Sequence, residues 1–266
     1  MVTVDDENNL NNFEELISTD PDIDVEKYSW DKVKDALERG VLRATNISVK
    51  KVILRAFREG NLVEINGYID KHTMLPQKFT LASDRKVRIV PYGSAARGGA
   101  YIATGVVIMP PSYVNVGAYV DEGTMIDSHV LVGSCAQIGK RVHLSAGVQI
   151  GGVLEPIGNR PVIIEDDVFI GAGSVIVEGI LVKRRAVIAP GVILSKGLRI
   201  YDLVNEVVLE RGAAVPEGAV VVPGVRAISN EKSWATQNGL YLQTPIIVKY
   251  RDQKSDASLT LEDALR

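Results

Sequence analysis

YVDEGTMIDSHVLVGSCAQIGKRVHLSAGVQIGG, Tyr119 to Gly152, carries an aliphatic residue at every sixth position, 120, 126, 132, 138, 144 and 150. The same spacing extends back to position 90, with a small or β-branched residue four places after nearly every aliphatic position. After an insertion of eight residues the frame resumes at 164 and continues to 200. A second interruption, Leu203 to Ala213, precedes the last repeats at Val215 and Val221.

A strict repeat of six residues is a signature of a parallel β-helix, in which each repeat buries one aliphatic side chain inside the coil. In proteins of the hexapeptide class, which this repeat resembles, the coil is left-handed and triangular, an exception to the right-handed crossover rule. Three hexads then make one coil, and successive coils stack about 4.8 Å apart. Residues that are three hexads apart are therefore predicted to be neighbours on adjacent coils. A series of such residues forms one column along the stack.

The flanks of the repeat show other patterns. Helical spacing of apolar residues predicts helices over Asp31 to Leu42, capped by Ser29 or Asp31 and ended by Gly40, and over Ser48 to Phe57, capped by Asn46. Alternation in Leu240 to Tyr250 predicts a strand, and a short helix is expected from Thr260. We therefore expect a mainly β protein with a small helical N-terminal domain (residues 1–85), a β-helix (86–228) and a C-terminal strand and tail (229–266).

Bulk composition excludes several classes of function. The 30 basic and 33 acidic residues give a net charge of -3, which favours neither nucleic acid nor a membrane surface as partner. No apolar run approaches the roughly 20 residues needed to span a bilayer, and the acidic segment Met1 to Thr19 does not resemble a secretory signal. A cytoplasmic protein is expected. The single cysteine, Cys135, excludes an intrachain disulfide and a cysteine metal cluster, and its surroundings predict a buried thiol.

The three carboxylates of the opening segment can be separated by the predicted stacking. Glu122 lies three hexads before Lys140, so an ion pair between adjacent coils is expected. Asp121 stacks on Gly139 and is expected to accept backbone N–H bonds in a turn. Asp127 has only Met109 and Ser145 in its column, which leaves its oxygens available to an outside donor such as an amine. From the pattern alone, Asp127 could have either a structural or a functional role.

The three histidines, His72, His129 and His143, do not predict a metal site. The separation of His129 from His143 is not a whole number of coils, so they do not share a column, and a third ligand is missing. No metal is expected. His129 could act as a base beside Asp127 or simply be solvated.

Three segments, YVDEGTMID, VGSCAQIGKRVHLSAGVQIGGVLEP and PVIIEDDVFIGAGSVIVEG, resemble the tetrahydrodipicolinate N-succinyltransferase family. LERGVLRAT, VRIVPYGSAARGGAYIA, RIYD and IIVKY extend the similarity outside the repeat, over roughly residues 30 to 251. The resemblance implies an acyltransferase of lysine and diaminopimelate biosynthesis. It would move a succinyl group from succinyl-CoA to the amine of ring-opened tetrahydrodipicolinate, L-2-amino-6-oxopimelate, by direct attack. It also implies a homotrimer with active sites in the grooves between subunits.

The resemblance also assigns residues. Asp127, which closes the GTM-aliphatic-Asp motif, would hold or deprotonate the acceptor amine, and Arg88 of the Arg-aliphatic-Val-Pro motif would bind its carboxylate. Glu178 is retained from the family pattern and could be catalytic or structural. For the CoA arm, Gly173, Ser174, Gly191 and Lys196 lie on turns whose N–H groups and one cation could meet the pantetheine and the phosphates.

The chain departs from the family pattern beside these positions. Val175 stands where many members have glutamate, Gly173 where they have arginine, and His129 where they have tryptophan. Acetyl-CoA in place of succinyl-CoA, or a related amino acid acceptor as in tabtoxin-type secondary metabolism, therefore stays open. A catalytically inert trimeric β-helix subunit is the alternative from a different functional class.

Overall fold

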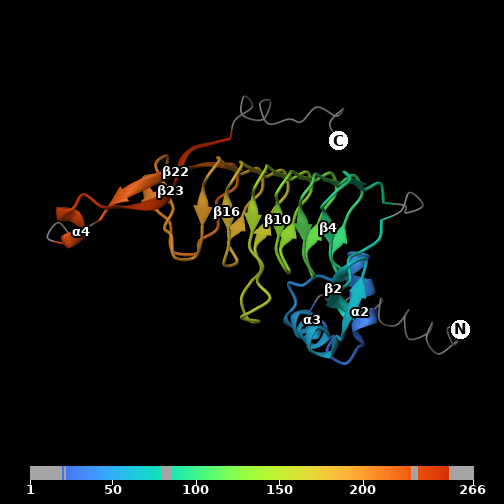
Figure 1. Cartoon of the computed structure of the whole chain (residues 1–266). Coiled ribbons are helices and arrows are strands. Elements are labelled where there is room, and N and C mark those ends of the chain that lie inside the picture. The colour runs from blue at the N-terminus through green and yellow to red at the C-terminus, as the bar shows by residue number, and fades with distance from the viewer. Residues whose placement is uncertain (1–19, 21, 80–84, 229–232, 252–266) are drawn as a thin grey trace, which may run out of the picture.

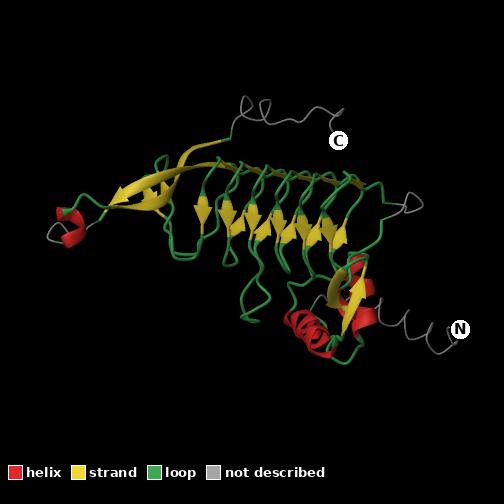
Figure 2. Ribbon diagram, in the orientation of Figure 1, coloured by secondary structure: helices red, strands yellow, loops and turns green. Residues whose placement is uncertain are grey.

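The computed structural model describes residues 20, 22–79, 85–228 and 233–251. A long stack of short strands forms the body of the protein, as Figure 1 shows, and its three parallel sheets make it a three-sided prism. A small unit with most of the helical residues lies against one end of the prism, and a long hairpin extends beyond the other (Figure 2). The expected helix from Thr260 lies outside the described residues.

The N-terminal unit contains helix α2 (Trp30–Glu38), helix α3 (Ile47–Glu59) and the 3₁₀ turn η1 (His72–Met74). The side chains of Ser29 and Asn46 cap the two helices by accepting N–H bonds from Lys32 and Ser48, as predicted. The first helix ends at Glu38, four residues before the expected end. Gly40, with φ of +76°, turns the chain so that buried Leu42 continues the apolar period without being helical.

An antiparallel hairpin of β1 (Leu62–Ile65) and β2 (Tyr68–Lys71) also belongs to this unit and was not predicted from the sequence. The apolar side chains Leu62, Tyr68 and Ile69 are exposed. Apolar and polar residues therefore do not alternate along LVEI and YIDK, and the sequence pattern typical of a half-buried strand is missing.

The prism has three faces, each a parallel stack in which strands from successive coils pair. Face 1 contains β4 (Ala95–Ala96), β7 (Tyr113–Val114), β10 (Leu131–Val132), β13 (Gln149–Ile150), β16 (Val175–Ile176) and β19 (Ile193–Leu194). Face 2 contains β5 (Tyr101–Ile102), β8 (Tyr119–Val120), β11 (Gln137–Ile138), β14 (Ile163–Ile164) and β17 (Leu181–Val182). Face 3 contains β3 (Arg88–Ile89), β6 (Val107–Ile108), β9 (Met125–Ile126), β12 (His143–Leu144), β15 (Phe169–Ile170) and β18 (Val187–Ile188).

Face 3 continues into the C-terminal elements. Strand β18 pairs with β22 (Ala219–Ala227), which forms the long hairpin with β23 (Tyr241–Tyr250), and α4 (Trp234–Gln237) lies between them in the chain. Strand β23 also pairs with β20 (Tyr201–Asp202), which is followed by β21 (Val207–Val208). The strand predicted over Leu240 to Tyr250 is confirmed.

The core of the prism confirms the six-residue frame. The second residue of each strand points inward, and from Ile102 to Leu194 every such residue is at most 2% exposed. In the regular part, paired strands are three hexads apart, for example Ile126 with Leu144. Across the first insertion Ile138 pairs with Ile164, so the inserted residues leave the stack and the register is kept. The chain therefore folds as the predicted left-handed parallel β-helix.

The frame is displaced by one residue at its start. Ile89, and not Val90, pairs with Ile108 and packs against the core. One extra residue between Ile89 and Ala96 is accommodated at Tyr92 and Gly93, which both have positive φ. The displacement puts Arg88 at the outward-facing position of β3.

The N-terminal unit is joined to the prism through its own apolar core. This core includes Val116 and Cys135 from the prism, together with residues of α2 and α3. Cys135 is fully buried, and this burial raises the pKa of its thiol to about 12. The predicted buried thiol is therefore confirmed.

Candidate active site

Asp127 lies in the turn that follows β9, on the edge where face 3 meets face 1. Its Oδ1 accepts the N–H of Ser128 at 2.7 Å, and its own N–H donates to the carbonyl of Leu144 at 2.9 Å. The hydroxyl of buried Ser112, on the preceding coil, donates to the carbonyl of Asp127 at 2.7 Å. Among the residues that the structure describes, the second oxygen of Asp127 has no hydrogen-bond partner or ion pair. A turn that is fixed on both sides thus holds a half-buried carboxylate with accepting capacity to spare.

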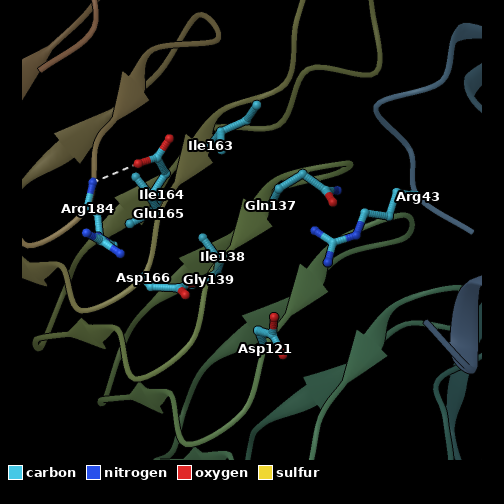
Figure 3. Close-up of a pocket in the computed structure, with 10 residues that line it drawn as sticks. All are labelled: Arg43, Asp121, Gln137, Ile138, Gly139, Ile163, Ile164, Glu165, Asp166 and Arg184. Atoms are coloured by element: carbon cyan, nitrogen blue, oxygen red, sulfur yellow. Dashed lines mark hydrogen bonds between the residues drawn. The ribbon is translucent and has the colours of Figure 1, made fainter. Parts of the chain in front are cut away.

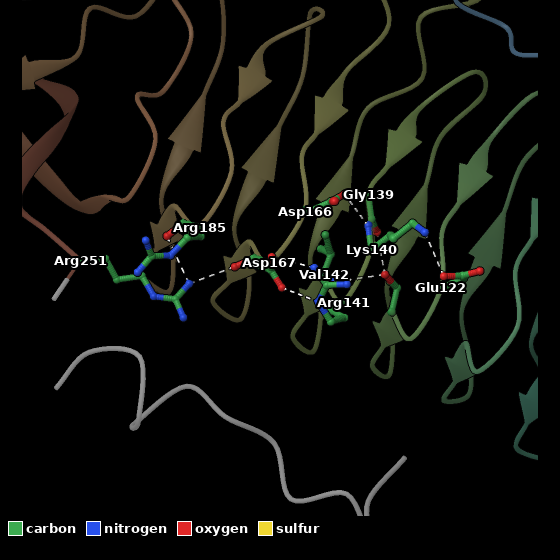
Figure 4. A network of polar contacts seen from close by, with 10 residues as sticks. Glu122, Gly139, Lys140, Arg141, Val142, Asp166, Asp167, Arg185 and Arg251 are labelled. Carbon is green, nitrogen blue, oxygen red and sulfur yellow. Dashed lines mark hydrogen bonds and ion pairs between the residues drawn. The ribbon is translucent and has the colours of Figure 1, made fainter. Parts of the chain in front are cut away.

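The neighbouring carboxylates are engaged, and Figure 4 shows this for Glu122. Glu122 forms an ion pair of 3.0 Å with Lys140, as the spacing of one coil predicted. Asp121 accepts the N–H of Glu122 at 2.8 Å, which confirms its predicted place in a turn. The pKa of Lys140 is raised by its hydrogen bond to Glu122 and also by the charge of Asp121. Asp121 and Asp127 therefore share the same local turn geometry and differ in the charges around them.

Arg88 lies on the same face as the strand that leads to Asp127. Outward positions of face 3 run from Arg88 through Val107 to Met125, because β3 pairs with β6 and β6 with β9. Two strand spacings separate Arg88 from Met125, which corresponds to about 10 Å. The guanidinium of an exposed arginine can reach from there toward a ligand of several carbon atoms beside Asp127.

Three of the residues predicted for the CoA arm share the edge of Asp127. The turn of Gly173 and Ser174 follows β15, and that of Gly191 follows β18, both strands of face 3. The N–H groups of Gly173 and Gly191 donate to the carbonyls of Ala146 and Ala172, so they are not available to a ligand. The space beside both Cα atoms is open, with no atom within 4 Å of the position that a Cβ would take. These glycines therefore provide a smooth surface and no hydrogen-bond donors.

Ser174 requires a correction. Its side chain is fully buried, and its hydroxyl donates to the carbonyl of Ala189 at 3.0 Å. Its N–H, the group predicted to meet the CoA arm, donates to the carbonyl of Gly171 at 3.3 Å. Neither group of Ser174 is therefore available to a ligand.

Glu178 and Lys196 lie on a different edge, between face 1 and face 2. A carboxylate oxygen of Glu178 accepts the N–H of Lys196 at 2.9 Å, so it ties one coil to the next. Within one chain the structure does not bring Glu178 near Asp127, because face 1 separates their two edges.

Face 1 beside Asp127 contains a cavity of about 370 Å³ that sequence reasoning missed. Its lining includes Tyr113, His129 and Gln149. The side-chain amide of Gln149 donates to the carbonyl of His129 at 3.2 Å, and the His129 side chain is exposed. Tyr113 and Gln149 both occupy outward-facing positions of face 1, two coils apart. Their spacing in the six-residue repeat could have identified them as neighbours of Asp127. Val175, further along the same face, pairs with Gln149 and supplies no carboxylate.

Among residues 20, 22–79, 85–228 and 233–251, no group of three or more histidine, cysteine, aspartate or glutamate residues could hold a metal ion. In the same ranges no helix is both long and apolar enough to cross a membrane.

Comparisons with known proteins agree with the hexapeptide-repeat fold. The family model described as hexapeptide repeat of succinyl-transferase matches residues 161–196. A 2,3,4,5-tetrahydropyridine-2,6-dicarboxylate N-succinyltransferase of Idiomarina loihiensis is 44% identical over 251 residues, covering 88% of this chain and 87% of the relative. A protein of the same name from Pectobacterium atrosepticum is 46% identical over 260 residues, covering 91% and 90%. The chain therefore belongs to the 2,3,4,5-tetrahydropyridine-2,6-dicarboxylate N-succinyltransferase family.

Proposed function

We propose that this protein transfers a succinyl group from succinyl-CoA to the amine of L-2-amino-6-oxopimelate, the ring-opened form of tetrahydrodipicolinate. The observation that carries the proposal is Asp127, a fixed carboxylate with one oxygen unpartnered among the described residues, inside the motif GTMID. Relatives at 44 to 46% identity that are named as this N-succinyltransferase support the reaction and its substrates.

In the proposed reaction Asp127 accepts a hydrogen bond from the acceptor ammonium and takes its proton as attack begins. The amine nitrogen then forms a bond to the thioester carbonyl carbon and the carbon–sulfur bond breaks. The nitrogen loses its second proton, which the departing CoA thiolate takes up, so that the products are a neutral amide and the CoA thiol. Arg88 binds a carboxylate of the acceptor, because a guanidinium can donate two parallel hydrogen bonds to that group. Holding both substrates in one complex makes a covalent enzyme intermediate unnecessary.

The CoA arm is proposed to follow the edge of Asp127 over the open surface at Gly173 and Gly191. Lys196 is exposed on the next edge, where it could meet a phosphate. Along this route the two glycines would leave room for the CoA arm, and the positive charge of Lys196 would attract a phosphate.

A homotrimer is proposed as the working form, with sites in the grooves between subunits. The supporting observation is that Asp127 and Glu178 lie on different edges of one prism, so only a second copy could bring a Glu178 to this Asp127. The proposed location is cytoplasmic, in keeping with diaminopimelate and lysine biosynthesis.

A turnover assay tests the proposal. Release of the CoA thiol is measured with succinyl-CoA or acetyl-CoA, each with and without the amino dicarboxylate acceptor. We expect release that requires both succinyl-CoA and the acceptor. Faster turnover with acetyl-CoA would move the proposal to the acetyl donor, which the changes at Val175, Gly173 and His129 make the natural competitor. No acceptor-dependent release with either donor would overturn it.

A further inference from the structure

The turn that contains Asp127 is built differently from the turns of the next two coils on the same edge. In the turn of residues 145–148, the N–H of the fourth residue donates to the carbonyl of the first at 3.2 Å. In the turn of residues 171–174, the same bond measures 3.3 Å. A bond of this kind closes an ordinary β-turn. In the turn of residues 127–130, the hydroxyl of Ser112 from the preceding coil stands between the two groups.

Ser112 bridges this open turn in two ways at once. Its Oγ accepts the N–H of Val130 at 3.1 Å and donates to the carbonyl of Asp127 at 2.7 Å. A hydroxyl can do both, since it has one donor and two lone pairs. Ser112 is 4% exposed, and its hydroxyl is committed to the turn. It therefore acts on Asp127 from inside the prism and does not contact a substrate.

The coil before Ser112 repeats the arrangement. The Oγ of Ser94 accepts the N–H of Ser112 at 3.1 Å and donates to the carbonyl of Met109 at 3.2 Å. Two serines in one column thus hold two successive turns of this edge open. The first serine also fixes the backbone of the second, so the hydroxyl that meets the carbonyl of Asp127 is itself held in place.

The other backbone bonds of this turn also occur in its neighbours. The N–H of His129 donates to the carbonyl of Pro111 at 2.8 Å, just as the N–H of Gly147 donates to that of Ser128 at 2.8 Å. Such bonds are compatible with a closed turn, because residues 145–148 form both kinds. The hydroxyl bridge is therefore the feature that distinguishes this turn, and it acts on the backbone of the residue that carries the candidate base.

We propose that Ser112 is a positioning residue of the acyl-transfer site, which holds this turn open and thereby sets where the Asp127 carboxylate meets the acceptor amine. The inference rests on the proposed function of Asp127 as the base. Without the hydroxyl, the carbonyl of Asp127 and the buried N–H of Val130 would lose their shared partner, which favours closure onto each other. Closure would move Asp127, and proton transfer requires a precise position.

A second bridged turn provides a matched control. The hydroxyl of Thr124 donates to the carbonyl of Gly139 at 2.9 Å and accepts the N–H of Val142 at 3.1 Å. This turn lies on the edge between face 2 and face 3, where Gly139 stands beside Asp166 (Figure 3). Strand β9 separates Thr124 from Asp127 in the chain. Loss of the Thr124 hydroxyl should therefore remove the same kind of bridge and leave Asp127 in place.

Steady-state CoA release with succinyl-CoA and the amino dicarboxylate tests the inference. Ser112→Ala should lower kcat roughly ten- to hundredfold, as expected when a catalytic group is misplaced by about 1 Å. The KM for succinyl-CoA should stay near the parental value. Thr124→Val should keep the parental kcat, although both variants should lower the melting temperature. Ser112→Thr returns a hydroxyl and should recover most of the kcat. If Ser112→Ala does not fold, Ser112→Cys replaces it, since a thiol fills the space but is a weaker donor.

A double variant separates positioning from a general structural effect. In the Asp127→Asn background, Ser112→Ala should cause no further loss of kcat, because the base that it positions is already absent. A full further loss in that background would overturn the inference. An equal loss of kcat in Thr124→Val would overturn it as well, and so would a Ser112→Thr variant as slow as Ser112→Ala.

Failure of this inference is distinguishable from failure of the proposed function. Parental kcat in Ser112→Ala, together with the expected loss in Asp127→Asn, would refute the role of Ser112 alone. Full activity of Asp127→Asn would refute the base and, with it, the positioning. Absence of acceptor-dependent CoA release from the parent would overturn the proposed function and this inference together.

Discussion

Glu122 and Lys140 form an ion pair of 3.0 Å across two adjacent coils, although a full coil of the chain separates them in sequence. Asp127, five residues after Glu122, has Met109 and Ser145 as its neighbours in the same kind of column. Glu122 therefore has a cation as its neighbour on the next coil, whereas both neighbours of Asp127 are uncharged. For this reason variants of these two residues should behave differently.

Asp127→Asn should lower kcat for acyl transfer by roughly a hundredfold to ten-thousandfold, the usual range for loss of a general base. The amide keeps the shape of the side chain and can still accept the Ser128 N–H, so the melting temperature should change little. Steady-state CoA release and thermal unfolding measure the two effects. Glu122→Gln is the matched control and should keep parental activity. Full activity of Asp127→Asn would show that the carboxylate takes no part in the reaction.

Arg88→Met should raise the KM for the amino dicarboxylate by roughly ten- to hundredfold, because it removes a charged hydrogen-bonding partner of the substrate. The KM for the acyl-CoA should stay near the parental value. Arg88→Lys should recover only part of the loss, since an ammonium cannot reproduce the two parallel bonds of a guanidinium. Arg211→Met, at another exposed arginine, is the control. An equal rise in KM for both substrates would contradict a role specific to the acceptor.

Ile164→Ala should reduce the free energy of unfolding by about 2 to 5 kcal/mol, as expected for a large-to-small change in a core. Ile164 is 1% exposed and fills one position of the prism interior. Ile163→Ala is a control of the same type, since Ile163 is its chain neighbour but points outward. Urea unfolding followed by circular dichroism compares the two variants. A larger loss for Ile163→Ala would contradict the observed direction of these side chains.

The frame of six residues predicted most of this architecture because every coil must bury aliphatic side chains at fixed intervals. It gave the Glu122–Lys140 pair, since a fixed repeat also fixes vertical neighbours. It failed at Val90, where one extra residue near Tyr92 shifts the inward position to Ile89. A single added residue leaves the apolar composition unchanged, so no pattern in the sequence revealed it.

The candidate site was only partly accessible from the sequence. Asp127 was identified by its column and its motif, but Ser174 was placed in the ligand surface although its hydroxyl points into the turn. The packing of the N-terminal unit on the prism, in which Val116 and Cys135 join the core of the helices, could not be predicted either. Contacts between separate units follow from tertiary packing and have no local sequence signal.

Tyr250→Phe should remove a pH-dependent contribution to stability at high pH. The hydroxyl of Tyr250 donates to Asp202 at 2.6 Å, and burial, together with this hydrogen bond to the carboxylate, raises the pKa of Tyr250 to about 12. A raised pKa means that folding favours the protonated phenol. Its contribution is therefore fully present below about pH 10, the unfolded value, and is lost as the pH rises toward 12.

Thermal unfolding between pH 8 and about pH 12 provides the measurement, within the range set by the unfolded and folded pKa values. The difference in melting temperature between the parent and Tyr250→Phe should be constant up to about pH 10 and should shrink above it. Tyr241→Phe, at an exposed tyrosine of the same strand, should follow the parent at every pH. A difference between the parent and Tyr250→Phe that stays constant over the whole range would mean that the pKa of Tyr250 is not shifted by folding. Such a result would also argue against the hydrogen bond from Tyr250 of β23 to Asp202 of β20, which links the last strand to the end of the prism.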